Sequence, residues 1–146
     1  MESIRVDTGI KRIAINDDPN RIISFNPNDL LFAEKFYAML KEVRKLLVEI
    51  EQKTAEFDKQ NIEDIYITDD VELPAIIDEV IEYHKQACEK MFVEIDKLFG
   101  AGTSEMVFQG MYALEIVAQF LDGITPFIAV KRAEKVNKYI KRRPTT

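Results

Sequence analysis

The feature that most constrains the fold is a long stripe of apolar residues between residues 33 and 57. The stripe repeats at alternating spacings of three and four residues, and charged residues flank it on both sides. Its members are Ala33, Phe36, Leu40, Val43, Leu47, Ile50, Thr54 and Phe57. This is the a/d pattern of coiled-coil-like packing, so it predicts a long helix that needs a partner helix.

A second amphipathic segment supplies a suitable partner. Pro74 can open a helix because the first turn does not need its N–H, and Gly100 is a typical C-terminal stop. The apolar face between them consists of Ile77, Val80, Ile81, His84, Ala87, Cys88, Met91, Ile95 and Leu98. We therefore predict two long helices, at residues 26–60 and 74–99, that pair with each other.

Short sequence signals predict where the first long helix starts and where the two helices are connected. Asn26 can cap free amides, Pro27 fits the first turn and Asp29 complements the helix dipole, so the first long helix is predicted to start there. The acidic stretch between Phe57 and Leu73 is predicted to connect the two helices, with a short element at Ile62–Ile67.

Residues 4–25, within the N-terminal arm predicted at residues 1–25, have the alternation of β-strands. Ile13 and Ile15 precede the turn-forming segment Asn16–Asn20, and Ile23 follows it, so the region is predicted to be a β-hairpin arm. An isolated hairpin is marginal in water, so this one must pack on the helices or on a partner.

Two shorter helices are predicted in the remainder of the chain. Thr103 or Ser104 caps a helix over residues 104–122, which is apolar on almost every side and so belongs at the centre of the bundle or against another chain. Pro126 opens a basic C-terminal helix over residues 126–143. The prediction is a mainly α protein of one domain spanning all 146 residues, with about four helices and a small N-terminal β-hairpin.

Composition and charge exclude several classes of protein. Cys88 is the single cysteine and cannot form an internal disulfide, and no apolar secretory signal opens the chain, so we expect a reducing cytosol. Charges interrupt every apolar segment, so none approaches the roughly 20 apolar residues of a membrane span. The net charge of −6 is uneven, because Lys131–Thr146 carries seven basic residues and one acidic residue.

Candidate catalytic residues are few. His84 and Cys88 lie one helical turn apart, but no further His or Cys completes a metal site and no orienting group supports a nucleophile. Acidic pairs such as Asp69/Asp70 fit no calcium-binding loop. Gly100–Ser104 could present amides to a phosphate, but no Gly-Lys-Ser/Thr follows, so a turn between helices is the simpler interpretation. We predict no enzyme activity, no metal site and no cofactor.

The basic C-terminal segment is a candidate contact surface. Its cations include Lys135, Lys138, Lys141, Arg142 and Arg143. Clustered cations gain affinity for nucleic acid or acidic membranes by releasing counterions. The rest of the chain is acidic, however, so an acidic partner or the chain's own acidic stretch is an equally simple target and nucleic acid is less favoured.

Six segments made of cap, turn and core residues carry a family resemblance. They are Ile13–Pro19, Ile23–Asp29, Phe32–Tyr37, Asp96–Ser104, Phe120–Phe127 and Arg132–Val136. Together they span nearly the whole chain and resemble a family of tail assembly chaperones from long-tailed bacteriophages and prophages of Gram-positive bacteria. None of the segments contains a catalytic signature.

The resemblance implies a non-enzymatic assembly factor in the host bacterial cytoplasm. Such proteins coat the long, helical tape measure protein before the tail tube forms, and they recruit or hand over to tail tube subunits. The implied partners are therefore the tape measure protein and the tail tube protein. Self-association is expected as well, and a membrane is not.

A chaperone of this kind needs exposed apolar surface on a charged body. We predict that Phe108, Met111, Tyr112, Phe120 and Phe127 form the partner-binding surface, with methionine adapting to varied side chains. The alternative is that these residues simply fill the core.

Two other functions stay open. One is a structural head–tail connector, in which the apolar helix and the hairpin form permanent subunit contacts. The other, less favoured, is a small-ligand binder that interferes with host nucleotide signalling and would need a cationic pocket between helices.

Overall fold

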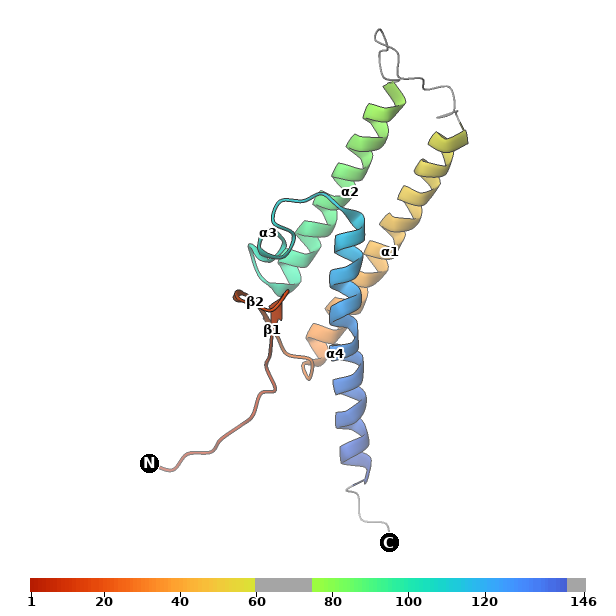
Figure 1. Cartoon of the computed structure of the whole chain (residues 1–146). Coiled ribbons are helices and arrows are strands. Elements are labelled where there is room, and N and C mark those ends of the chain that lie inside the picture. Colours follow the sequence, from red (N-terminus) through yellow and green to blue (C-terminus); the bar gives the residue numbers. More distant parts are fainter. Residues whose placement is uncertain (60–74, 142–146) are drawn as a thin grey trace.

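A computed structural model describes residues 1–59 and 75–141, with side chains described for residues 1–56 and 77–128. The elements are β1 (Lys11–Ile15), β2 (Asp18–Phe25), α1 (Leu30–Lys59), α2 (Ala75–Phe99), α3 (Thr103–Phe108) and α4 (Leu114–Lys141). Helices α1 and α2 lie side by side, the hairpin and α3 pack at one end of the pair, and α4 runs past that end (Figure 1). The predicted mainly helical fold with four helices and an N-terminal hairpin is confirmed for the described residues.

Helices α1 and α2 pair through the two predicted apolar faces. The buried residues on these faces are Ala33, Phe36, Val43, Ile50, Ala87, Cys88, Met91 and Ile95. Ile81 was predicted to share the α2 face but is 60% exposed. The contact follows alternating spacings of three and four residues through Val80 and His84, which leaves Ile81 off the seam. The predicted connection, including Ile62–Ile67, falls on residues 60–74, outside the described residues.

The hairpin is antiparallel, with Ile13 opposite Ile23, and its turn is tighter than predicted. Asn16 and Asp17 both have positive φ, 52° and 60°, as in the two-residue turns whose twist matches the strands. Strand β2 therefore already begins at Asp18. Residues 1–10, which belonged to the predicted hairpin arm, form no strand.

Helix α1 begins four residues later than predicted, at Leu30 instead of residue 26. The Asp29 carboxylate accepts a hydrogen bond from the Leu31 N–H at 3.0 Å, so Asp29 is the cap. The Asn26 side chain is used elsewhere, because its Oδ1 accepts from the Asn28 N–H at 3.0 Å and its Nδ2 donates to the Thr8 carbonyl at 2.6 Å.

The predicted apolar helix over residues 104–122 is interrupted. Gln109 and Gly110 adopt left-handed conformations with φ of 53° and 78°, and they end α3 after six residues. The Gln109 N–H donates to the Glu105 carbonyl at 2.9 Å, which closes the last turn of α3. Gly110 is of the residue type that commonly follows a helix C-terminus, but it was not predicted to end a helix.

The predicted boundary between the third and fourth helices is absent, since α4 continues through Gly123 and Pro126. An interior proline costs about 3 kcal/mol and a glycine about 1 kcal/mol relative to alanine. The buried residues of α4 are Val117, Phe120, Leu121, Ile124 and Ile128, which lie on both sides of these positions. Burying each such side chain contributes about 1.5–3 kcal/mol, so packing outweighs the two helix breakers.

The core is densest where the hairpin and α3 meet α1, α2 and α4. The Phe99 ring lies 6.0 Å from that of Phe25, 5.7 Å from that of Phe32 and 5.7 Å from that of Phe120. Arg21 of β2 donates from Nε to the Met106 carbonyl at 3.0 Å and from Nη2 to the Val107 carbonyl at 2.7 Å. This cation satisfies free carbonyls near the C-terminus of α3 and fixes the hairpin to that helix.

Candidate protein-binding surfaces

The five residues predicted to bind a partner do not form one surface. Phe108 and Phe120 are 1% and 8% exposed, and their rings are 5.7 Å apart in the core. Phe127 is half-buried, and the Lys11 ammonium lies 5.6 Å above its ring. Phe108 and Phe120 are therefore core residues, and the five side chains do not line one exposed groove.

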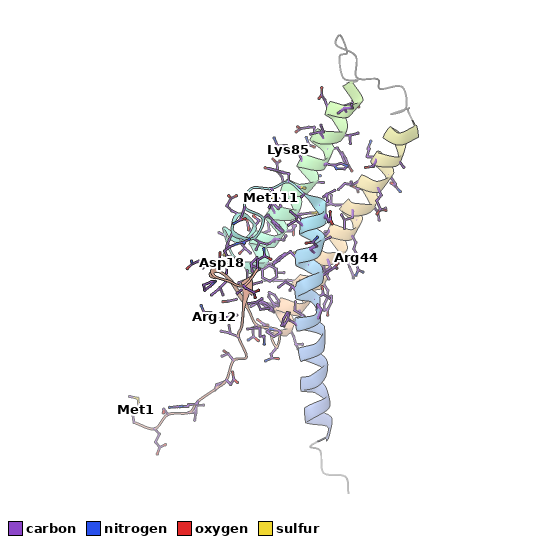
Figure 2. All side chains as sticks on the ribbon, in the orientation of Figure 1. Met1, Arg12, Asp18, Arg44, Lys85 and Met111 are labelled. Carbon is purple, nitrogen blue, oxygen red and sulfur yellow. The ribbon has the colours of Figure 1, made fainter. Side chains whose placement is uncertain are left out.

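Met111 and Tyr112 are the exposed members of the set, at 46% and 50%. They lie in the turn between α3 and α4, and Tyr112 packs against side chains of α2; Figure 2 labels Met111 in this turn and Lys85 on α2. The Tyr112 ring is 5.5 Å from that of Phe92, and the Lys85 ammonium lies 5.9 Å from the Tyr112 ring centroid. We call Phe92, Met111, Tyr112 and the adjoining α2 residues Lys85 and Glu89 the Tyr112 surface.

The Tyr112 surface combines apolar side chains with polar and charged groups. The Tyr112 hydroxyl donates to the Glu89 carboxylate at 3.3 Å. Partial desolvation and the nearby Glu89 charge raise the pKa of the Tyr112 hydroxyl above its ordinary value. Exposed Val93, one turn further along α2 than Glu89, extends the apolar area. An adaptable methionine beside an aromatic ring is a combination typical of protein-binding surfaces.

A separate groove of about 300 Å³ opens between β1, α3 and α4. Its walls consist of Ile13, Ala14, Ile15, Asn16, Val107, Ile116, Gln119, Phe120, Gly123 and Ile124. The lining contains no charged side chain, although nearly a third of the chain's residues are charged (32%). We call it the β1–α4 groove, and it suits apolar side chains rather than an ionic ligand.

Strand β1 presents its edge to this groove. Neighbouring side chains of a strand point to opposite faces, yet three consecutive β1 residues and Asn16 line the groove. Such a run indicates that the groove follows the strand edge. The sheet has only two strands, so the β1 edge away from β2 has no partner strand in the described part of the chain.

Helix α4 forms the opposite wall through residues at four-residue spacing. Ile116, Phe120 and Ile124 line the groove, with Phe120 and Ile124 buried at its base. Gly123 lies beside them, and a Cβ added there would meet no atom within 4 Å. The missing side chain at Gly123 therefore keeps this part of the groove open.

The sequence model of a protein family matches residues 20–146, which is most of the chain. The chain belongs to the DUF6673 family. The description of that family is a family of unknown function. No curated protein and no solved structure matches the chain. In this DUF6673 member, the matched region begins within β2 and includes every helix.

The basic segment of this DUF6673 member lies in the last part of α4. Lys135, Lys138 and Lys141 belong to the stretch of α4 that extends beyond the other helices (Figure 1). Arg142 and Arg143 lie outside the described residues. The side chains after Ile128 are not described, so the predicted role of these cations stays a prediction.

The His84 and Cys88 pair has no nucleophile–base geometry. The His84 Nε2 is hydrogen-bonded to the Thr54 Oγ1 at 3.2 Å, and Cys88 is 1% exposed. Burial, with a smaller contribution from the Glu89 charge, raises the pKa of the Cys88 thiol and disfavours the reactive thiolate. Within residues 1–59 and 75–141, no three His, Cys, Asp or Glu residues are grouped so as to hold a metal ion.

The Gly100–Ser104 segment is the predicted turn between two helices, and the amides that a phosphate would need are bound within the protein. Asp96 accepts hydrogen bonds from the Ser104 N–H at 2.7 Å and from the Ser104 Oγ at 2.9 Å. A carboxylate from α2 therefore occupies the position that an anion would take at the start of α3. Sequence reasoning missed this cap because Asp96 lies eight residues earlier and on another helix.

In the described part of the chain, no helix is both long and apolar enough to cross a bilayer. The helix that was predicted to be apolar on most sides is divided between short α3 and the start of α4.

Proposed function

We propose that this chain is a tail assembly chaperone of a long-tailed phage or prophage. It binds the tape measure protein in the bacterial cytoplasm, keeps that protein soluble and promotes assembly of tail tube subunits, without catalysing a reaction. The resemblance of six sequence segments supports the identity of the partners. The Tyr112 surface is the structural observation that carries the binding role.

The Tyr112 surface offers what a transient chaperone contact needs. Tyr112 is half exposed and rests on Phe92, so its ring is already positioned before a partner arrives. Lys85 and Glu89 surround it with charge of both signs, which suits an amphipathic helix that buries one apolar stripe. A single small surface binds weakly, and many copies along one long partner add their contacts while each can still be released.

The test is co-expression of this chain with the long helical protein encoded beside it. The chaperone should raise the soluble yield of that partner and elute with it from a sizing column. Tyr112→Ser combined with Met111→Ser should lower the affinity by about tenfold or more, because two apolar anchors are lost.

Val48→Ser is the matched control, since Val48 is also about half exposed (51%) but lies on α1. With the Val48→Ser chain, the soluble yield of the partner and the amount of complex should equal those obtained with the unsubstituted chain. An unchanged partner yield with no complex on the column would exclude the chaperone role. If the Val48 variant loses as much affinity for the partner as the Tyr112 and Met111 double variant, the Tyr112 surface is not the binding site.

A structural head–tail connector is the second candidate, and one observation favours it. The N-terminal residues leave the body with apolar side chains exposed, as expected of a permanent subunit contact. A connector should be present at fixed copy number in purified virions, whereas a chaperone should be absent from them.

A further inference from the structure

We propose that the N-terminal arm, residues 1–7, of one copy binds the β1–α4 groove of a second copy. In this arrangement the arm adds a strand to the free edge of β1, and Ile4 and Val6 pack on α4. The inference uses a surface different from the Tyr112 surface and does not depend on which partner the chaperone binds.

The arm has the alternation of a strand, but it pairs with no strand in the described part of its own chain. Ile4 and Val6 are 88% and 72% exposed, and Met1 at the tip lies far from the helices (Figures 1 and 2). Residues two apart in an extended segment point to the same face, so these two apolar side chains would enter a groove together. Ser3 and Arg5 would then point to the other face.

The root of the arm is held in a conformation that directs it away from its own groove. The Gly9 N–H donates to the Asp7 carboxylate at 2.9 Å, and the Asn26 side chain holds the Thr8 carbonyl at 2.6 Å. Gly9 has φ of 77°, and a Cβ there would collide with the Asn28 side-chain amide, so the turn depends on glycine. The arm leaves this anchored turn pointing away from the hairpin and α4 (Figure 1).

The groove matches the arm in backbone chemistry and in volume. The unpaired edge of β1 offers N–H and C=O groups to an incoming extended segment, which is the usual mode of strand addition. The seven side-chain carbons of one isoleucine and one valine need roughly 200 Å³ if each takes about the 30 Å³ of a water. The groove provides about 300 Å³.

The polarity of the groove favours this occupant over a charged one. Its walls contain no Lys, Arg, Asp or Glu, and its polar side chains are only Asn16 and Gln119. The two arm side chains that would enter the groove, Ile4 and Val6, are uncharged, whereas Arg5 on the other face would remain in solvent. Glu2 shares the face of Ile4 and Val6, so its carboxylate has to lie beyond the end of the groove. Reciprocal exchange of two arms would give a closed dimer, in which each copy both donates and accepts a strand.

The first test is the solution mass of the full chain over a concentration series, by light scattering after size exclusion. The unsubstituted chain should form a dimer. Ile4→Asn combined with Val6→Asn should raise the dimer Kd by about tenfold or more for each side chain lost. Ser3→Asn combined with Arg5→Asn changes the other face of the arm and should leave the Kd within about threefold. A chain that is monomeric at all concentrations, or equal losses in both variants, would overturn the proposal.

The second test fills the groove from the α4 side. Gly123→Leu adds a side chain where a Cβ meets no neighbour, so it should keep or raise the Tm while it abolishes the dimer. Gly123→Ala is the matched control, since it gains the same helix preference but adds a single methyl group, and it should retain the dimer. A Gly123→Leu chain that is stable and still dimeric would exclude the groove as the binding site.

The third test separates exchange between copies from folding back within one copy. A chain with Val6→Cys is mixed with a chain with Gln119→Cys under mild oxidation, and a covalent heterodimer is expected. Cys88 is buried and should contribute little background. If a chain with both substitutions forms only an internal disulfide and the mixture forms none, the arm binds its own groove and the proposal is wrong.

Discussion

The two ends of the α1–α2 pair are built on different principles. In the part that we call the stalk, residues 49–59 and 75–84, α1 and α2 lie against each other alone (Figure 1). At the hairpin end, strands β1 and β2 and helices α3 and α4 add to the same pair, and rings from β2, α1 and α4 contact Phe99 of α2. A repeating local pattern is sufficient for the stalk, whereas the hairpin end depends on contacts between residues far apart in the chain.

The largest expected effect compares two positions of the same α1 seam. Phe36 is 0% exposed among the rings of the hairpin end, and Ile50 is 4% exposed in the stalk. Phe36→Ala should lower the free energy of unfolding by about 3–5 kcal/mol, and Ile50→Ala by about 2 kcal/mol, because fewer elements surround the stalk cavity. Urea denaturation followed by circular dichroism measures both. If Ile50→Ala lowered the free energy of unfolding more than Phe36→Ala, the hairpin end would not be the more tightly packed region.

The next effect concerns the cap that joins α2 to α3. Asp96→Ala removes two hydrogen bonds to Ser104, at 2.7 and 2.9 Å, and should cost about 2 kcal/mol of unfolding free energy. Ser104→Ala keeps the bond from the backbone N–H and should cost about 1 kcal/mol. If both variants unfold at the same urea concentration, the Asp96 carboxylate is not the cap that stabilises α3.

A smaller effect is expected in the stalk. Thr54→Val removes the hydrogen bond to His84 while keeping the side-chain volume, and it should cost at most about 1 kcal/mol. Amide hydrogen exchange should accelerate in the stalk and stay unchanged at the hairpin end. Acceleration at both ends would mean that the two regions open as one unit.

The smallest effect at neutral pH concerns Cys88, which lies between the two regions. Burial raises the pKa of its thiol in the folded state, so its contribution to stability is fully present below the ordinary pKa and is lost as the pH rises from that value through the raised folded-state pKa. A disulfide reagent should therefore react much more slowly with native protein than with protein in urea, and the unfolding free energy should fall above about pH 9. Cys88→Ala should lack this alkaline decline.

Individual elements show how far sequence reasoning reached. The two long helices and the hairpin were predicted correctly, because each depends on period or turn chemistry within a short window. Of the predicted α1 seam, Ala33, Phe36, Val43 and Ile50 are buried, the Phe57 side chain lies outside the described residues, and buried Met39 was not predicted. The start of α1 was displaced because Asn26 and Asp29 are both good caps, and only the anchored turn to Thr8 decides between them. Similarly, Gly110 and Gly123 are both possible stops, but only Gly110 ends a helix.

The candidate surfaces were harder to predict than the fold. Of the residues predicted to bind a partner, Met111 and Tyr112 are exposed and Phe108 and Phe120 are buried in the core, and the binding role itself stays a prediction. The β1–α4 groove was not predicted, because its two walls are separated by about a hundred residues in the chain and are brought together only by tertiary packing.

The sequence by itself determined the helical pairing and the hairpin, since both follow from interactions between neighbours a few residues apart. Only the tertiary structure decided where α3 ends, why α4 continues through Pro126 and which apolar side chains stay exposed. The physical reason is that each of these outcomes balances a local preference of about 1–3 kcal/mol against burial by residues far away in the chain.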